Sequence, residues 1–319
     1  MTTPSLPVVD FLGIGAQRTA TTWLHTCLNH HPGVWLPPWI KEVHYFDRLV
    51  RAGFPPPPMS LPLPGLLEVW RPGSLLGRKK RRQMLFASLR GLAFGQRLGR
   101  RDSARLLSWW LDVHRPAPSS DAWYRRLFRP GEGRVKGEIT PAYALLDEAR
   151  VRHVVELFPD IGVIFTIRDP IARTLSALRY GRAYAQRNTS PIQLVESKNC
   201  RLRNDYLRTI DLWSAHIPPE RLLVCWYDDL EADPVAFLGR ILGFLGVDAS
   251  PAAEIVATVT NQPEARNTAP EVAFPEEVLR RIAEVSRPGI AALVDRYGGH
   301  AVRWLERCDR TLGGDLFGG

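Results

Sequence analysis

The chain has 319 residues and a mass of 36.0 kDa, which suits one large domain spanning residues 1–319. With 45% hydrophobic and 24% charged residues it has enough apolar material for a core, so wholesale disorder is excluded. No apolar run approaches the ~18 residues of a membrane-spanning helix, and the amino terminus does not resemble a secretory signal. The four widely spaced cysteines exclude a disulfide framework and a zinc finger. Together these features predict a cytoplasmic protein.

The net charge of +9 is concentrated in one segment. Residues 51–115 hold 13 Lys or Arg against three acids, so the rest of the chain is close to neutral. Four consecutive prolines at 55–58 favour a stiff, extended linker. Residues 84–113 then show apolar side chains at roughly helical spacing with arginines between them. We therefore predict an insertion over 51–118, made of a Pro-rich linker and one or two basic amphipathic helices.

Several roles for this insertion stay open. A solvated helical lid would account for it, and so would a surface for an anionic acceptor or a cover over an anionic cofactor. A further alternative is peripheral membrane contact through residues 78–113. Basic charge alone would also suit nucleic acid, but the chain carries no recognised nucleic-acid motif, so we expect no such partner.

Outside the insertion, strand patterns alternate with helix patterns. In chain order we predict a strand at 8–14, a helix at 21–29, a strand at 134–139, a helix at 147–157, a strand at 163–167, a helix from 170, a helix at 203–216, a strand at 221–226, a helix at 233–245 and two helices within 275–304. This alternation predicts an α/β fold, in which a parallel sheet is flanked by helices.

The segment after the first predicted strand has the form of a phosphate-binding loop. It opens a helix, whose backbone N–H groups and dipole can hold a phosphate, and it reads Gly13-Ile14-Gly15-Ala16-Gln17-Arg18-Thr19-Ala20-Thr21-Thr22. A dinucleotide fingerprint would need a third glycine at Arg18. A Walker A loop would need Gly-Lys at 20–21, where the chain has Ala-Thr. The loop therefore favours a different phosphorylated ligand, although a turn without a ligand is the simpler alternative.

Five segments, in family order, resemble sulfotransferases that use 3′-phosphoadenosine 5′-phosphosulfate (PAPS). Residues 15–22 resemble their 5′-phosphosulfate loop, and residues 168–176 look like their 3′-phosphate segment. Residues 41–47 (KEVHYFD) are similar to the acceptor motif of the heparan-sulfate branch and its bacterial relatives. Residues 138–143 (EITPAY) resemble a Glu-Lys-Thr-Pro-Ala-Tyr stretch, and 227–247 match a C-terminal strand–helix pattern. The resemblance implies a single sulfotransferase domain with a P-loop-NTPase-like sheet.

The resemblance also implies a PAPS site. Arg18 takes the place of the family's loop lysine, where a guanidinium can grip two phosphate oxygens and stabilise the leaving phosphate. Arg168 and Ser176 are assigned to the 3′-phosphate, and a weaker match suggests a C-terminal clamp at Arg266. The 5′ end of the donor is assigned to Gln17, Arg18, Thr19, Ala20, Thr21 and Thr22.

The acceptor motif implies Glu42 as the general base, a role that a raised pKa in a partly closed cleft would help. In an extended stretch His44 shares a face with Glu42, so it can orient that carboxylate or act as the base itself. Lys41 and Asp47 are weaker candidates. Many relatives have a lysine at the position of Ile139; either Lys136 replaces it or the contact is absent.

The sequence thus predicts a cytoplasmic sulfotransferase that moves the sulfuryl group of PAPS to a hydroxyl of a small molecule, glycan or glycolipid. No metal is expected. The alternatives are a P-loop-like nucleotide kinase or hydrolase, which would need the missing Walker lysine, and a non-catalytic binding protein that keeps the fold. The acceptor and the oligomeric state stay open.

Overall fold

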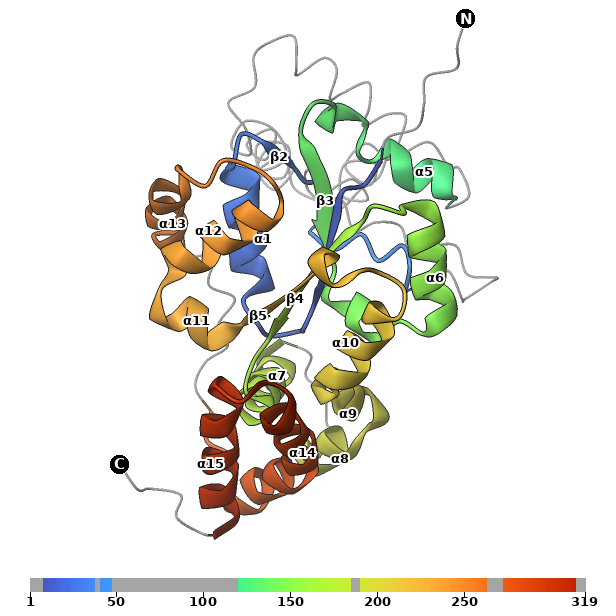
Figure 1. Ribbon diagram of the computed structural model, residues 1–319. Helices are drawn as coiled ribbons and strands as arrows, with labels where there is room; N and C mark the ends of the chain where they lie inside the picture. Colours follow the sequence, from blue (N-terminus) through green and yellow to red (C-terminus); the bar gives the residue numbers. More distant parts are fainter. Residues whose placement is uncertain (1–7, 38–40, 48–119, 185–189, 263–271, 314–319) are drawn as a thin grey trace, which may run out of the picture.

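The computed structural model describes residues 8–37, 41–47, 120–184, 190–262 and 272–313 (Figure 1). The predicted insertion at 51–118 and Arg266 lie outside the described residues. The described chain forms a five-stranded parallel sheet in the order β2-β3-β1-β4-β5, flanked by helices. The predicted α/β class, a parallel sheet flanked by helices, is confirmed. The strands are β1 (Phe11–Gly15), β2 (Val34–Trp35), β3 (Val135–Ile139), β4 (Gly162–Ile167) and β5 (Leu222–Trp226).

The helices lie on both faces of this sheet (Figure 1). They are α1 (Thr21–His30), α5 (Asp121–Arg126), α6 (Glu148–Leu157), α7 (Pro170–Tyr184), α8 (Pro191–Glu196), α9 (Lys198–Asn204), α10 (Tyr206–Ser214), α11 (Tyr227–Ala232), α12 (Pro234–Phe244), α13 (Ala252–Thr260), α14 (Glu276–Tyr297) and α15 (His300–Gly313). Short 3₁₀ turns follow β3 at η2 (Pro141–Leu145) and occur at η1 (Arg129–Gly131) and η3 (Pro219–Arg221). Among the described residues, no helix is long and apolar enough to cross a membrane.

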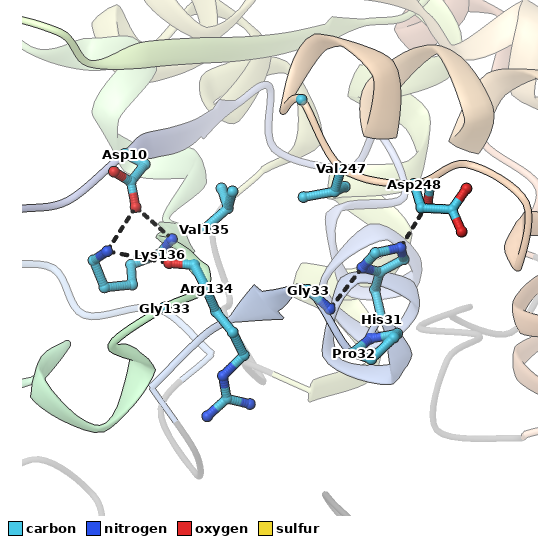
Figure 2. A pocket seen from close by; sticks show the side chains of 11 residues that line it. Asp10, His31, Pro32, Gly33, Gly133, Arg134, Val135, Lys136, Val247 and Asp248 are labelled. Carbon is cyan, nitrogen blue, oxygen red and sulfur yellow. Dashed lines mark hydrogen bonds and ion pairs between the residues drawn. The ribbon is translucent and has the colours of Figure 1, made fainter.

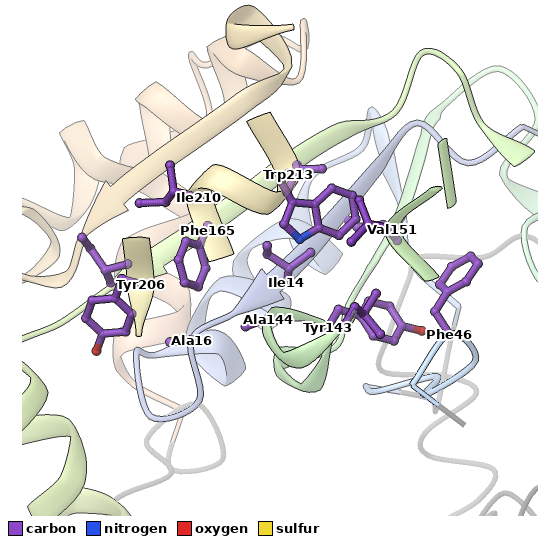
Figure 3. Close-up of a cluster of buried hydrophobic side chains, with 14 of the residues drawn as sticks. Ile14, Ala16, Phe46, Tyr143, Ala144, Val151, Phe165, Tyr206, Ile210 and Trp213 are labelled. Carbon is purple, nitrogen blue, oxygen red and sulfur yellow. The ribbon is translucent and has the colours of Figure 1, made fainter. Parts of the chain in front are cut away.

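Two hydrophobic clusters cover the two faces of the sheet, because alternate strand residues point to opposite sides. On one face, Ile14 and Phe165 pack with Ile210 and Trp213 of α10 (Figure 3). On the other face, Phe11 packs with residues of α1, α12 and α13. Burying each such large side chain stabilises the fold by roughly 1.5–3 kcal/mol. The runs of apolar residues in β1 and β4 therefore mark strands that are buried on both sides.

Close backbone approach fixes β3 against β1. Gly137 lies opposite Phe11 in the register, and a Cβ atom there would sit 2.4 Å from the Phe11 ring. Glycine is therefore required at this position, and β3 is held in the register that carries its far end to the carboxyl edge of the sheet.

The sequence prediction was wrong in several boundaries. The segment 203–216 is not one helix: α9 ends and α10 begins at Asp205, whose carboxylate accepts a hydrogen bond from the Arg208 N–H and caps α10. The first strand begins at Phe11 rather than at residue 8, and the last helix runs to Gly313. Strand β2 was not predicted because two residues carry no periodic pattern. The short helices α5, α8, α11 and α13 were also missed, as was most of α9.

Candidate active site

The loop between β1 and α1 lies at the carboxyl edge of the sheet. The Ala16 N–H donates to the carbonyl of Thr166 on β4 (2.6 Å), and the Thr19 hydroxyl donates to the Ala16 carbonyl (2.7 Å). Arg18 and Ala20 have positive φ angles of 72° and 57°, a conformation uncommon for residues with a side chain. These bonds and turns lead the chain tightly into the amino terminus of α1, where backbone N–H groups favour an anion.

Arg18, Arg168 and Ser176 come together at this edge from three separate elements. The Arg18 Nε donates to the Ser176 hydroxyl of α7 (3.0 Å), and the Arg168 Nη1 donates to the Arg18 carbonyl (3.3 Å). The Arg18 guanidinium lies 4.7 Å from the centre of the Tyr180 ring, and the Arg168 guanidinium lies 4.0 Å from that of Tyr227. The loops after β1 and β4 thus form a basic region where the strand order reverses, the usual ligand position in open parallel sheets.

The other predicted loop residues line the same turn. Gln17 is exposed, while Thr22 and Ala20 are half-buried. Thr19 is buried and its hydroxyl is already used inside the loop, and Thr21 is buried at the start of α1. Their assignment to the 5′ end of a donor stays a prediction.

The acceptor motif forms a chain of charged side chains. The His44 Nε2 lies 3.2 Å from one Glu42 oxygen, and its Nδ1 lies 2.9 Å from Asp47. The Lys41 ammonium lies 2.9 Å from the second Glu42 oxygen. His44 meets Glu42 as expected, but the reason we gave was wrong: His44 has a φ of 56°, so a left-handed turn and not an extended stretch brings the two side chains together.

The expected rise in the pKa of Glu42 is wrong for this structure. Burial does raise the pKa of this carboxyl, but the hydrogen bond from His44 and the charge of Lys41 outweigh burial and lower the pKa to about 2. Glu42 is therefore ionised throughout the neutral range. A carboxylate held in this way is ready to accept a proton but is a weak base.

Lys136 does not replace the lysine that relatives have at position 139. Its ammonium lies 3.1 Å from Asp10 and donates to the Arg134 carbonyl (3.1 Å) at the amino end of β3. It lines a cavity of about 490 Å³ at the amino edge of the sheet, together with His31 (Figure 2). Ile139, at the other end of the strand, is buried in the core against Gly13.

Sequence reasoning missed two residues beside the acceptor motif. The pKa of His25 on α1 is lowered to about 4 by burial and by the charge of Lys41, against an opposite effect of Glu42. Glu138 on β3 accepts a hydrogen bond from the Val43 N–H, between Glu42 and His44. Nothing in the sequence marks His25 except its position one turn after the loop. Glu138, in contrast, begins the segment 138–143, which resembles a stretch of the family.

Comparison with known proteins identifies the family and agrees with the fold. A model of the sulfotransferase family matches residues 11–251. The structure of a sulfotransferase from Alicyclobacillus acidocaldarius is 16% identical, with a TM-score of 0.58 over 93% of this chain and 98% of that one. The sulfotransferase domain of an olefin synthase from Synechococcus PCC 7002 is 20% identical, with a TM-score of 0.47 over 90% and 95%. No curated protein matches significantly.

A parallel sheet with a tight loop between β1 and α1 and a basic side chain after β4 gives the chain a P-loop-like fold. The family match covers well over half of the sequence, so the chain belongs to the sulfotransferase family. Membership supports transferase activity, and it favours the predicted sulfotransferase over the kinase and hydrolase alternatives.

Proposed function

We propose that this protein transfers the sulfuryl group of PAPS to an acceptor hydroxyl. The observation that carries the proposal is the meeting of Arg18, Arg168 and Ser176 at the carboxyl edge of the sheet. The loop that holds Arg18 ends at the amino terminus of α1, and His25 lies one turn further on, where the charges of Lys41 and Glu42 act on its pKa. A donor in the loop and an acceptor at Glu42 would therefore meet over the first turns of one helix.

The donor site suits a nucleotide with phosphate at both ends. Arg18 and the α1 amino terminus would hold the 5′ phosphosulfate, and Arg168 with Ser176 would hold the 3′-phosphate. Two cationic side chains on separate loops match the two anionic ends of PAPS, whereas an ordinary adenylate would leave one of them unused. Arg18 and Ser176 bond to each other here, so the donor would exchange this contact for contacts with its own oxygens.

In the reaction, the acceptor oxygen forms a bond to sulfur while the bond from sulfur to the 5′-phosphate oxygen breaks. The electron pair of the broken bond goes to the phosphate, and Arg18 stabilises the charge that grows there. The hydroxyl proton goes to Glu42. The analogy is phosphoryl transfer through a loose transition state, where the attacking hydroxyl becomes acidic only as its oxygen bonds to the transferred group. A weak base such as Glu42 therefore suffices to take the proton.

His44 would hold Glu42 in place for this step. It bonds Glu42 through Nε2 and Asp47 through Nδ1, which leaves the imidazole few orientations. We assign His44 the orienting role, and a direct base role is the second candidate. No step needs a metal, and we expect the acceptor to be a small-molecule, glycan or glycolipid hydroxyl. A cytoplasmic location stays a prediction.

The variant Glu42→Gln tests the base. It keeps the shape of the side chain and removes the proton acceptor, so turnover should fall by about 10²–10⁴-fold. Turnover is measured as release of 3′-phosphoadenosine 5′-phosphate from PAPS with a panel of phenolic, aliphatic and sugar hydroxyls. The affinity of Glu42→Gln for 3′-phosphoadenosine 5′-phosphate, measured by calorimetry, should equal that of the wild type.

The control is Glu254→Gln, which changes an exposed glutamate of α13 and should leave both quantities unchanged. Undiminished turnover of Glu42→Gln would remove Glu42 as the base. A wild-type protein that binds AMP as tightly as 3′-phosphoadenosine 5′-phosphate would contradict the choice of donor.

A further inference from the structure

Glu138 is a buried carboxylate that the proposed reaction does not use. It is 1% exposed, and four donors converge on its two oxygens. The Tyr124 hydroxyl (2.7 Å) and the Tyr143 hydroxyl (2.8 Å) donate to Oε1, while the Thr140 hydroxyl (2.6 Å) and the Val43 N–H (3.1 Å) donate to Oε2. A buried carboxylate is costly unless its lone pairs are all used, and here each oxygen accepts two bonds.

Two of these bonds reach the acceptor motif. Glu138 accepts directly from the Val43 N–H, and the Tyr143 hydroxyl, itself a donor to Glu138, accepts from the Tyr45 N–H (3.0 Å). These two backbone groups alternate along the chain with Glu42 and His44. Fixing the N–H groups of residues 43 and 45 therefore fixes the backbone that carries both polar side chains, including the left-handed turn at His44.

We propose that Glu138 is a positioning residue, which sets the placement of Glu42 and His44 by holding the backbone of residues 41–47. This inference rests on the proposed sulfuryl transfer for its effect on rate, although the backbone contact stands without it. Among the described residues, the Tyr124 and Thr140 hydroxyls donate to Glu138 and not to that backbone, so they serve to satisfy Glu138 itself.

The matched variants Tyr143→Phe and Thr140→Val test this role. Each removes one buried hydroxyl that donates to Glu138, but only Tyr143 also links to residues 41–47. Hydrogen exchange of the peptide containing residues 41–47, followed by mass spectrometry, should speed up about tenfold in Tyr143→Phe. The same peptide should exchange at the wild-type rate in Thr140→Val.

Turnover gives the second readout. In Tyr143→Phe it should fall about tenfold with unchanged affinity for 3′-phosphoadenosine 5′-phosphate, because a displaced Glu42 affects the transfer step and not donor binding. Thr140→Val should keep turnover. Equal exchange and equal turnover losses in the two variants would overturn the proposal and leave Glu138 a core residue.

The exchange readout separates this inference from the proposed function. If the wild-type protein transfers no sulfuryl group but Tyr143→Phe alone loosens residues 41–47, the function fails and the positioning contact stands. If the wild-type protein is active and Tyr143→Phe changes neither exchange nor turnover, the positioning role fails and the function stands. Two further variants test Glu138 directly. Glu138→Gln keeps an acceptor for the Val43 N–H, whereas Glu138→Ala removes it, so the peptide containing residues 41–47 should exchange more slowly in Glu138→Gln than in Glu138→Ala.

Discussion

At the residue scale, the proposed donor site is built on guanidinium groups that also stack on aromatic rings. Arg18 lies over Tyr180 and Arg168 over Tyr227, contacts that a planar cation makes better than an ammonium. Stacking orients each guanidinium before any anion arrives, so less side-chain entropy is lost on binding. The departure from the family's loop lysine at Arg18 is therefore compatible with a preorganised site, although Arg18 cannot act as a proton donor.

Arg168 should decide selectivity for a 3′-phosphate. Arg168→Ala removes the cation assigned to that group, so affinity for 3′-phosphoadenosine 5′-phosphate should fall about 10–100-fold. Affinity for AMP, which lacks the 3′-phosphate, should change little. Calorimetry with both nucleotides measures the ratio. The control is Arg221→Ala. Arg221 lies directly before β5, and this variant removes its ion pair with Asp160. Equal weakening of both nucleotides would show that Arg168 does not read the 3′-phosphate.

At the element scale, strands were predictable where burial on both faces leaves a continuous apolar run, as in β1 and β4. The division of residues 203–216 between α9 and α10 was not predictable, because the spacing of apolar residues continues across the break at Asp205. The break has a consequence for the site: α10 starts at Tyr206, whose hydroxyl donates to the Arg168 carbonyl (2.8 Å). A capping side chain in the middle of a helical pattern was the available signal.

Asp205 should therefore contribute to stability as a helix cap. Asp205→Ala removes the bond to the Arg208 N–H, which costs about 1 kcal/mol for a typical cap. We expect the melting temperature to fall by a few degrees. Differential scanning calorimetry measures the change, with Asp295→Ala at an exposed position of α14 as control. A melting temperature equal to that of the wild type would mean that the segment is held by packing alone.

At the scale of the whole molecule, motif order predicted more than local patterns did. The family resemblance assigned the loop after β1 and Arg168 after β4 to one ligand. The structure does bring Arg18, Arg168 and Ser176 together, since parallel strands bring their carboxyl ends to one edge. The pKa of Glu42 and the turn at His44 were not predictable, since both depend on the exact path of residues 41–47.

The stability of the fold should decrease on mild acidification, with His25 as one cause. Its Nε2 is buried without a hydrogen-bond partner among the described residues. Burial, helped by the charge of Lys41, lowers the pKa of His25 from 6.5 to about 4. Between these values the unfolded chain binds a proton that the folded chain does not, so the free energy of unfolding decreases as the pH falls. The lowered pKa of Glu42 acts in the same direction at still lower pH, reduced by solvent screening.

The variant His25→Gln should flatten this dependence. It removes the titrating group, so the melting temperature of the variant should fall less than that of the wild type between pH 6.5 and pH 4, by a few degrees. Calorimetric scans in buffers of matched ionic strength measure the two curves. His30→Gln, which replaces an exposed imidazole at the end of the same helix, is the control. Parallel curves for the wild type and His25→Gln would mean that His25 takes up its proton as readily in the folded chain as in the unfolded one, which would contradict its burial beside Lys41.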